Sequence, residues 1–339
     1  MRAGGATLSL TREQILGFRR RVGALDRRLP AGPDSLRQAA WAGLQDSMPR
    51  AAVLSIHARV EGTTPSSWED PSLVQLWGPR FSVYVVAECD RAVFSLSRLP
   101  DDAKGRKQAE DAAAHVHAAL EAERKGTAAP VLGDHPFSLR RAIPTGTVLI
   151  RWAGARAPTL RVVPRPDVDP LDARRELARR YLHVYGPATQ ASFSEWAGIH
   201  ARWGAATFES LQAELTAVRT PIGDGVILSS DETGFLGDPT LDAPARLLPS
   251  GDAYYLLQGA DRMLLVPDAG RRAELWTSRV WPGALLLDGD IRGTWRRSQG
   301  TVSIQAWGRM SRTERGAVEA EAALLPLPDV SRIVVRWQS

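Results

Sequence analysis

The segment GLQDSMPRAAVLSIHARV, residues 43–60, places a polar triplet directly before an apolar helical pattern. The triplet is Gln45-Asp46-Ser47, and Met48-Pro49 follows it. Proline is preorganised for the first turn of a helix, and Asp or Ser side chains accept hydrogen bonds from the free N–H groups there. We therefore expect a buried helix that begins after the triplet, with Asp46 and Ser47 as candidate caps.

The composition is that of a globular protein with a biased choice of basic residues. Hydrophobic residues make up 44% of the 339 residues and charged residues 24%, which is ordinary for a folded chain of more than one domain. Lysine occurs only at positions 104, 107 and 125, so nearly all of the 43 basic residues are arginine. Such a bias is typical both of phosphate binding and of GC-rich genomes, and composition does not separate the two.

Three regions carry the basic excess of the chain. Residues 1–30 hold seven Arg against two acidic residues, residues 136–185 hold ten against four, and residues 271–315 hold nine against four. Separate basic regions of this kind could line one cleft for a polyanion, although each one alone could equally be a solvated face.

Several classes of site and of location are excluded by simple counts. A single cysteine, Cys89, excludes an internal disulfide framework and a cysteine-based zinc site. The sequence has no glycine-rich phosphate loop, no metal-ligand cluster and no nucleophile elbow, so we expect neither a cofactor nor a metal. The amino terminus lacks an apolar signal core, and no apolar run is long enough to span a membrane. We therefore expect a cytoplasmic protein without membrane contact.

The pattern of helices, prolines and short strands predicts an α+β protein of four parts. Tandem helix-turn-helix units with wings are expected at residues 1–90, 91–165 and 166–235, and a small β-barrel at residues 236–339. The run Pro164-Arg165-Pro166 through Pro170 is the clearest linker, because three prolines in seven residues cannot continue a helix. In the third unit, Gly198 allows a turn before a candidate recognition helix at 205–217; a small three-helix packing unit without a DNA role is the alternative.

After residue 220 the pattern changes to short apolar runs between turns. Asp288-Gly289-Asp290 is a strong hairpin signal, and a closing helix is expected near residues 312–323. Apolar runs at 254–257 and 263–266 also suggest strands, which together favour a barrel or a curled sheet.

Three segments of this chain resemble the winged-helix DNA glycosylases of the AlkZ/YcaQ-like family, which excise alkylated bases and unhook interstrand crosslinks. They are residues 43–60, the run from Tyr181 to Gly198 that contains Gly186-Pro187-Ala188-Thr189, and residues 282–295. The resemblance implies three tandem winged helices around a basic concave surface, plus a small barrel. It also implies duplex DNA with alkylated bases as the partner, and we expect the chain to act as a monomer without a metal.

The resemblance also implies roles for the triplet, position by position. In the family the motif reads Gln-hydrophobic-Gln or Gln-hydrophobic-Asp, so Gln45 would position water or contact the sugar. Ser47 stands where the second Gln or Asp is usual, and Asp46 fills the hydrophobic middle position, where it could be the electrostatic or general-base group. The competing interpretation is a helix cap with Gln45 on the surface, and the two can coexist. His57 is a further candidate, but a packed core histidine is the simpler interpretation.

DNA contacts are expected from arginines beside the motif and around the hairpin near residue 290. The candidates are Arg50, Arg202, Arg292, Arg296 and Arg297. The departure of the triplet from the family pattern suggests a narrow substrate specificity. Our hypothesis is that the chain belongs to a specialised branch of the family, which removes bulky N7-guanine adducts of the kind left by DNA-alkylating antibiotics. The competing class is a winged-helix protein that binds DNA or its lesions without catalysis.

Overall fold

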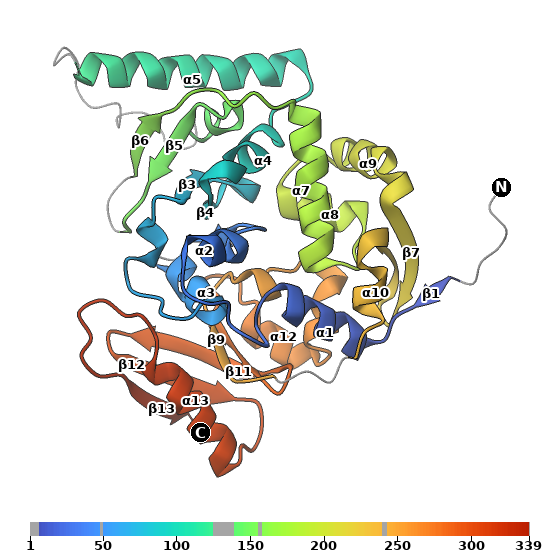
Figure 1. Ribbon diagram of the computed structural model, residues 1–339, viewed down its shortest axis with the longest axis vertical. Helices are drawn as coiled ribbons and strands as arrows, with labels where there is room; N and C mark the ends of the chain where they lie inside the picture. The colour runs from blue at the N-terminus through green and yellow to red at the C-terminus, as the bar shows by residue number, and fades with distance from the viewer. Residues whose placement is uncertain (1–6, 48–49, 125–138, 155–157, 239–242, 339) are drawn as a thin grey trace.

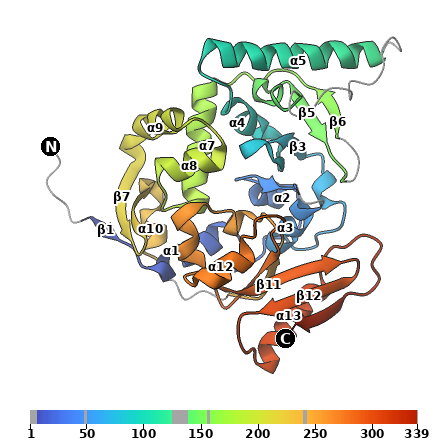
Figure 2. The same ribbon diagram turned by 180° about the vertical axis from the view of Figure 1, so that it is seen from behind.

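The computed structural model describes residues 7–47, 50–124, 139–154, 158–238 and 243–338. These residues form a mixed α+β architecture in which helices pack around three β-sheets (Figure 1). The long helix α5 lies at one end of the molecule and the carboxy-terminal sheet at the other, as the reverse view also shows (Figure 2). None of the helices in these ranges has the length and apolar character that a membrane span requires.

The amino-terminal half is built on a five-stranded sheet of order β2-β4-β3-β5-β6. Every residue of β4, which lies between β2 and β3, is buried, because the strand is covered on both faces. The strands are β2 (Leu44–Gln45), β3 (Leu73–Trp77), β4 (Val83–Ala87), β5 (Val148–Arg151) and β6 (Thr159–Val162). The helices of this half are α1 (Arg12–Val22), α2 (Pro33–Ala39), α3 (Ala51–Arg59), α4 (Arg91–Leu96) and α5 (Ala103–Arg124).

Strands from both sides of the predicted limit at residue 90 share this sheet. Gln75 in β3 pairs with Ile150 in β5, so the first two predicted units are joined by strand pairing. The domain limits at residues 90, 165 and 235, and the number of winged helices, stay predictions.

The third unit consists of three helices followed by a hairpin, which is the element order of a winged helix. Its elements are α7 (Pro170–Tyr185), α8 (Gln190–Ala197), α9 (Ala201–Ser210), β7 (Leu215–Thr220) and β8 (Gly223–Leu228). The Thr189 hydroxyl caps α8 by accepting from the Ser192 N–H at 3.1 Å, and Gly198 ends the helix with a φ of 67°. The candidate recognition helix is shorter than expected at 205–217, because α9 ends at Ser210 and the wing strand β7 begins at Leu215. Strand β1 (Leu8–Ser9) pairs in parallel with β7.

The carboxy-terminal part is a five-stranded sheet of order β13-β12-β11-β10-β9. Asp288 and Gly289, with φ angles of 51° and 82°, make the predicted tight turn between β10 and β11. The strands are β9 (Arg246–Leu248), β10 (Gly283–Leu287), β11 (Asp290–Ser298), β12 (Thr301–Ala306) and β13 (Val334–Gln338). The helices are α10 (Glu232–Phe235), α11 (Arg262–Leu265), α12 (Ala269–Leu275) and α13 (Arg312–Ala323).

The expected C-terminal β-barrel is not present in the described residues, because this sheet stays open between the edge strands β9 and β13. The physical reason is the helix α13. Its Val318 and Ala322 share one apolar core with Leu285 and Ile304 of the sheet, so the helix buries the face that closure of a barrel would bury.

Two strands expected inside this part are helical instead. Residues 253–255 form a single helical turn, and the second apolar run forms α11. The Asp252 side chain begins the first turn by accepting a hydrogen bond from the Tyr254 N–H at 2.9 Å. Short apolar runs do not distinguish a buried strand from a buried helical turn.

Much of the arginine excess is structural. The buried Arg19 guanidinium donates to the carbonyls of Tyr185 and Gly186, which fixes α1 against the end of α7. The buried Arg174 donates to the carbonyls of Ser97 and Leu99 and pairs with Asp101 at 2.9 Å. The basic regions therefore overstate the charge that is available to a polyanion.

Candidate active site

The polar triplet lies where the amino-terminal and carboxy-terminal sheets meet. Gln45 is the last residue of β2 and pairs with Tyr84 in β4, and the Asp46 N–H donates to the Val83 carbonyl at 2.7 Å. Helix α3 follows, and its Val53 and Ile56 share one apolar core with Leu247 and Leu285 of the carboxy-terminal sheet. The core of α3 thus fixes the triplet between the two sheets (Figure 1).

The Asp46 side chain is buried, and it caps α3. Its Oδ1 accepts a hydrogen bond from the Ala52 N–H at 3.0 Å, and its Oδ2 accepts from Gln75 Nε2 at 2.9 Å. The exposed fraction of the residue is 1%, so the carboxyl group does not face solvent. Burial raises the pKa of Asp46 to about 6, although the Ala52 N–H, Arg50 and Gln75 each favour the ionised form. The capping interpretation of Asp46 is confirmed.

Gln45 and Ser47 lie together on the opposite side of the chain from Asp46. Alternation along an extended segment puts the first and third residues on one side, and Gln45 Nε2 donates to Ser47 Oγ at 3.2 Å. Gln45 Oε1 is buried and has no hydrogen-bond partner in the described part of the chain. A buried acceptor without a partner costs free energy, so it is a candidate contact for a substrate or a water molecule.

Gly251 forms the wall opposite the Gln45 side chain. A Cβ at this position would lie 3.1 Å from Gln45 Oε1 and 3.2 Å from its Cδ, and the backbone φ is +76°. Both the close approach and the left-handed backbone favour glycine. The loop after β9 thus supplies a surface against which the Gln45 amide rests.

A buried ion pair ties this loop to α3. Asp252 receives two hydrogen bonds from the Arg59 guanidinium, at 2.7 and 2.8 Å, and one from Ser55 Oγ at 2.6 Å. The side chains of Asp252 and Arg59 are 0% and 5% exposed. The pair therefore holds Gly251 in place beside Gln45.

Gln75, which the sequence did not single out, joins the triplet to the second half of the sheet. Its Nε2 binds Asp46, and its Oε1 accepts a hydrogen bond from the Trp152 N–H at 2.8 Å. In the sequence, Gln75 is recognisable only as a glutamine inside an apolar strand, and this pattern does not predict which residues it binds.

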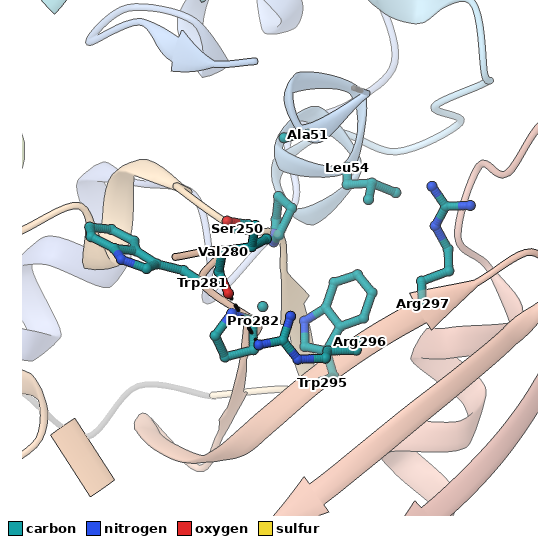
Figure 3. Close-up of a pocket in the computed structure, with 11 residues that line it drawn as sticks. Ala51, Leu54, Ser250, Val280, Trp281, Pro282, Trp295, Arg296 and Arg297 are labelled. Atoms are coloured by element: carbon teal, nitrogen blue, oxygen red, sulfur yellow. Dashed lines mark hydrogen bonds between the residues drawn. The ribbon is translucent and has the colours of Figure 1, made fainter. Parts of the chain in front are cut away.

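A pocket of about 190 Å³ lies beside the triplet, between the start of α3 and the carboxy-terminal sheet (Figure 3). Most of its wall is apolar, and Arg296 and Arg297 are its charged members. The lining residues are Ala51, Leu54, Pro249, Ser250, Val280, Trp281, Pro282, Gly283, Trp295, Arg296 and Arg297. Ala51 follows the triplet by four residues, and Ser250 precedes Gly251, which contacts Gln45. The pocket therefore adjoins the triplet, although Gln45, Asp46 and Ser47 are not among its lining residues.

The family model described as "DNA glycosylase AlkZ-like" matches residues 39–326, which include the triplet, α3 and the whole pocket. The chain belongs to this DNA glycosylase family. An interstrand DNA cross-link repair glycosylase of Streptomyces sahachiroi is 28% identical over 186 residues, which are 51% of this chain. The match spans 47% of that relative, about half of its length.

The fold is also that of a solved member of the family. The structure of Streptomyces sahachiroi DNA glycosylase AlkZ matches with a TM-score of 0.74 and covers 98% of this chain and 100% of that one. The two chains are 17% identical, so this likeness concerns the fold. It agrees with the mixed α+β architecture expected from the sequence.

Among the arginines predicted to bind DNA, three lie around the site of this AlkZ-like chain. Arg296 and Arg297 are exposed and line the pocket. Arg50 begins α3 with a left-handed φ of 70°, and its guanidinium lies 4.3 Å from the ring centre of Trp68. Stacking on an indole ring leaves the N–H edges of a guanidinium available to phosphate oxygens.

The other two arginines lie away from the pocket lining. Arg202 is exposed in the first turn of α9, and Arg292 forms an ion pair with Glu314 at 3.6 Å. Their roles in DNA binding stay predictions, as do those of the first three.

His57 is a packed residue, as its apolar neighbours suggested. It is 6% exposed, and its Nε2 lies 3.1 Å from Arg28 Nη2. Burial and the nearby Arg28 lower the pKa of His57 to about 3, so its ring is neutral near pH 7. No group of three or more His, Cys, Asp or Glu side chains suited to a metal ion occurs in the described ranges.

The raised pKa of Asp46 predicts a pH-dependent stability. Because the folded-state pKa of about 6 exceeds the ordinary value of 3.8 for an aspartate, the folded protein binds this proton more tightly than the unfolded chain. The contribution of Asp46 to stability is therefore full below pH 4 and declines as the pH rises toward 6 and above, by about 3 kcal/mol. Urea unfolding of wild type and Asp46→Asn between pH 4 and 7.5 measures it. The difference between the two free energies of unfolding should fall with pH, and a constant difference would exclude a raised pKa.

Proposed function

We propose that the protein is a monofunctional, metal-independent DNA glycosylase that hydrolyses the N-glycosidic bond of alkylated bases in duplex DNA, with bulky N7-guanine adducts as its preferred lesions. The single observation that carries this proposal is the buried, unpartnered amide oxygen of Gln45 beside a pocket, within the segment that matches the family. The cross-link repair activity in the name of the Streptomyces relative supports the same class of substrate.

The chemistry requires few protein groups. Alkylation at N7 places a positive charge on guanine, so the base leaves without strong general-acid assistance and the sugar develops oxocarbenium character. An amide oxygen that is already desolvated stabilises that positive charge or orients a water molecule for attack. We assign this task to Gln45 Oε1, and we assign to the Ser47 hydroxyl the orientation of the Gln45 amide through their hydrogen bond.

Asp46 acts as a positioning residue in this proposal. Both of its carboxylate oxygens are engaged, one by the first turn of α3 and one by Gln75. A carboxyl group that is 1% exposed does not reach a substrate, so general-base catalysis by Asp46 is not required. Its ionisation and its two hydrogen bonds instead hold Gln45 and Ser47 in one geometry.

Arg50, Arg296 and Arg297 would hold the phosphates on either side of the lesion, with Arg202 and Arg292 as more distant contacts. Arg296 and Arg297 line the pocket and Arg50 directly precedes its lining residue Ala51, whereas Arg292 is already paired with Glu314. Phosphate contacts position the duplex and carry no sequence information, which suits an enzyme that recognises damage.

A salt titration tests this interface. Arg297→Ala should weaken binding of undamaged duplex and reduce the slope of log K against log salt by about 1, because one phosphate contact is lost. Arg332→Ala is the matched control, since Arg332 is exposed and is not among the residues that line the pocket. Equal slopes for Arg297→Ala and wild type, measured by fluorescence anisotropy, would remove Arg297 from the interface.

The preference for bulky lesions is tested by base release under single-turnover conditions. Wild-type protein is incubated with a duplex that carries N7-methylguanine and with one that carries an N7-guanine adduct bearing an aromatic group. We expect faster release of the bulky base, and efficient release of the methylated base without such a preference would refute this part of the proposal.

The second candidate function is a DNA-binding protein that has lost catalysis. Ser47 favours it, because a serine lacks both the reach and the charge of the Gln or Asp usual at this position of the family motif. This candidate predicts salt-dependent duplex binding without an abasic product.

A further inference from the structure

The pocket beside Gln45 is lined mainly by apolar residues, with Ser250, Arg296 and Arg297 as its polar members. Leu54, Val280 and Trp295 supply apolar side chains from three different segments, and none of the lining residues is acidic (Figure 3). The indole N–H of Trp295 already donates to the Leu248 carbonyl at 2.8 Å. The pocket therefore offers little to the hydrogen-bonding edge of a base, and no carboxylate to a cationic purine.

The size of the pocket suits an aromatic group. A volume of about 190 Å³ exceeds the roughly 150 Å³ of an apolar cavity that accepts benzene in another protein. Removal of such a group from water is favourable in proportion to the apolar area that becomes buried.

The location of the pocket connects it to the reacting bond. Ser250 in its wall precedes Gly251, which rests against the Gln45 amide, and Ala51 lies in the first turn of the helix that Asp46 caps. Arg296 and Arg297 are exposed at the same pocket, where phosphates of a bound duplex would meet them. A substituent on a base held at Gln45 would thus enter an apolar space beneath a cationic rim.

We propose that this pocket binds the apolar, aromatic part of a bulky base adduct, while the purine itself stays at Gln45. The inference rests on the proposed glycosylase function and adds the residues that select the lesion. Occupancy by the aromatic part strengthens binding of the adduct in the transition state, whereas a methyl group leaves the pocket empty. Loss of one well-fitted apolar contact changes discrimination by about 10-fold or more.

Filling the pocket provides the first test. Ser250 is partly buried and lies in the pocket wall, so Ser250→Phe adds an aromatic ring there at low risk to folding. We expect the ratio of kcat/KM for the aromatic adduct to that for N7-methylguanine to fall about 10-fold. Ser278→Phe is the matched control, because Ser278 is exposed nearby and does not line the pocket, and it should keep the wild-type ratio.

A second variant changes the polarity of the pocket instead of its volume. Val280 is 47% exposed, so Val280→Asp places a carboxylate at the pocket without disturbing the core. An apolar group that enters the pocket would remove water from this carboxylate, which costs free energy. The ratio of kcat/KM for the aromatic adduct to that for N7-methylguanine should therefore be lower than in the wild type. Val168→Asp makes the same change at another exposed valine, which is 42% exposed and outside the pocket, and should not alter the ratio.

The outcomes separate this inference from the proposed function. A lower ratio for both pocket variants, with unchanged melting temperatures and unchanged ratios for the controls, supports the pocket as the adduct subsite. Equal slowing of both substrates would overturn it and would assign the pocket to the purine instead, while the glycosylase function would stand. Absence of base release by the wild-type protein from either duplex would refute the proposed function itself.

Discussion

Replacing Asp252 by alanine is expected to lower the free energy of unfolding by about 3–5 kcal/mol, because the change leaves the Arg59 charge buried without its partner. Arg59 is 4% exposed and donates two hydrogen bonds to Asp252. The Ser55 hydroxyl and the Tyr254 N–H lose an acceptor in the same variant. Urea unfolding followed by circular dichroism measures the change.

A surface pair provides the control for Asp252→Ala. Asp224 and Arg219 lie 3.5 Å apart, and their side chains are 76% and 68% exposed. Removal of an exposed pair costs at most about 1 kcal/mol, so Asp224→Ala should unfold almost as the wild type does. Similar losses for Asp224→Ala and Asp252→Ala would show that the buried pair does not tie α3 to the Gly251 loop.

Gln45→Ala is expected to slow base release by about 100-fold or more while duplex binding stays within a few-fold of wild type. The reason is that the amide oxygen acts on charge that develops only in the transition state, and loss of one such preorganised group costs about that factor. Gln45 is the last residue of the edge strand β2, and its side chain contacts Gly251. We therefore expect Gln45→Ala to fold as the wild type does. Single-turnover release and anisotropy measured on the same preparations separate chemistry from binding.

Gln212→Ala is the matched control for Gln45→Ala, because Gln212 is exposed in the turn before the wing strand β7 and lies outside the pocket. It should release base at the wild-type rate. Parallel losses of binding and release in Gln45→Ala would assign the residue to duplex binding, and unchanged release would remove it from the active site.

Local chemistry predicted much of the secondary structure. Gly198 marked the turn that ends α8, and Asp288-Gly289 marked the turn between β10 and β11. Both depend on residues that are neighbours in the chain, where capping and φ preferences decide the outcome. The sequence left a barrel and a curled sheet as alternatives for the C-terminal part, because the choice depends on how α13 packs across strands that lie far from it in sequence.

In the candidate site, too, features that depend on neighbouring residues were predictable and features that depend on distant segments were not. The triplet and the cap at Asp46 could be found from the sequence, because a carboxylate directly before a helix has a local purpose. Gln75, Gly251 and the pair between Asp252 and Arg59 could not, because their partners come from distant segments. Of the predicted arginines, Arg50 comes to the site from the start of α3, and Arg296 and Arg297 both come from β11.

The most direct test of the central claim is a count of abasic sites in duplex DNA carrying a bulky N7-guanine adduct, after incubation with excess wild-type protein. Alkaline cleavage at the adducted position, corrected for spontaneous depurination, gives this count. We predict one abasic site per adduct, the released base in solution, and no abasic sites in an undamaged duplex. Salt-sensitive binding of the adducted duplex with no abasic sites above the spontaneous level would contradict the account and would identify a DNA-binding protein without glycosylase activity.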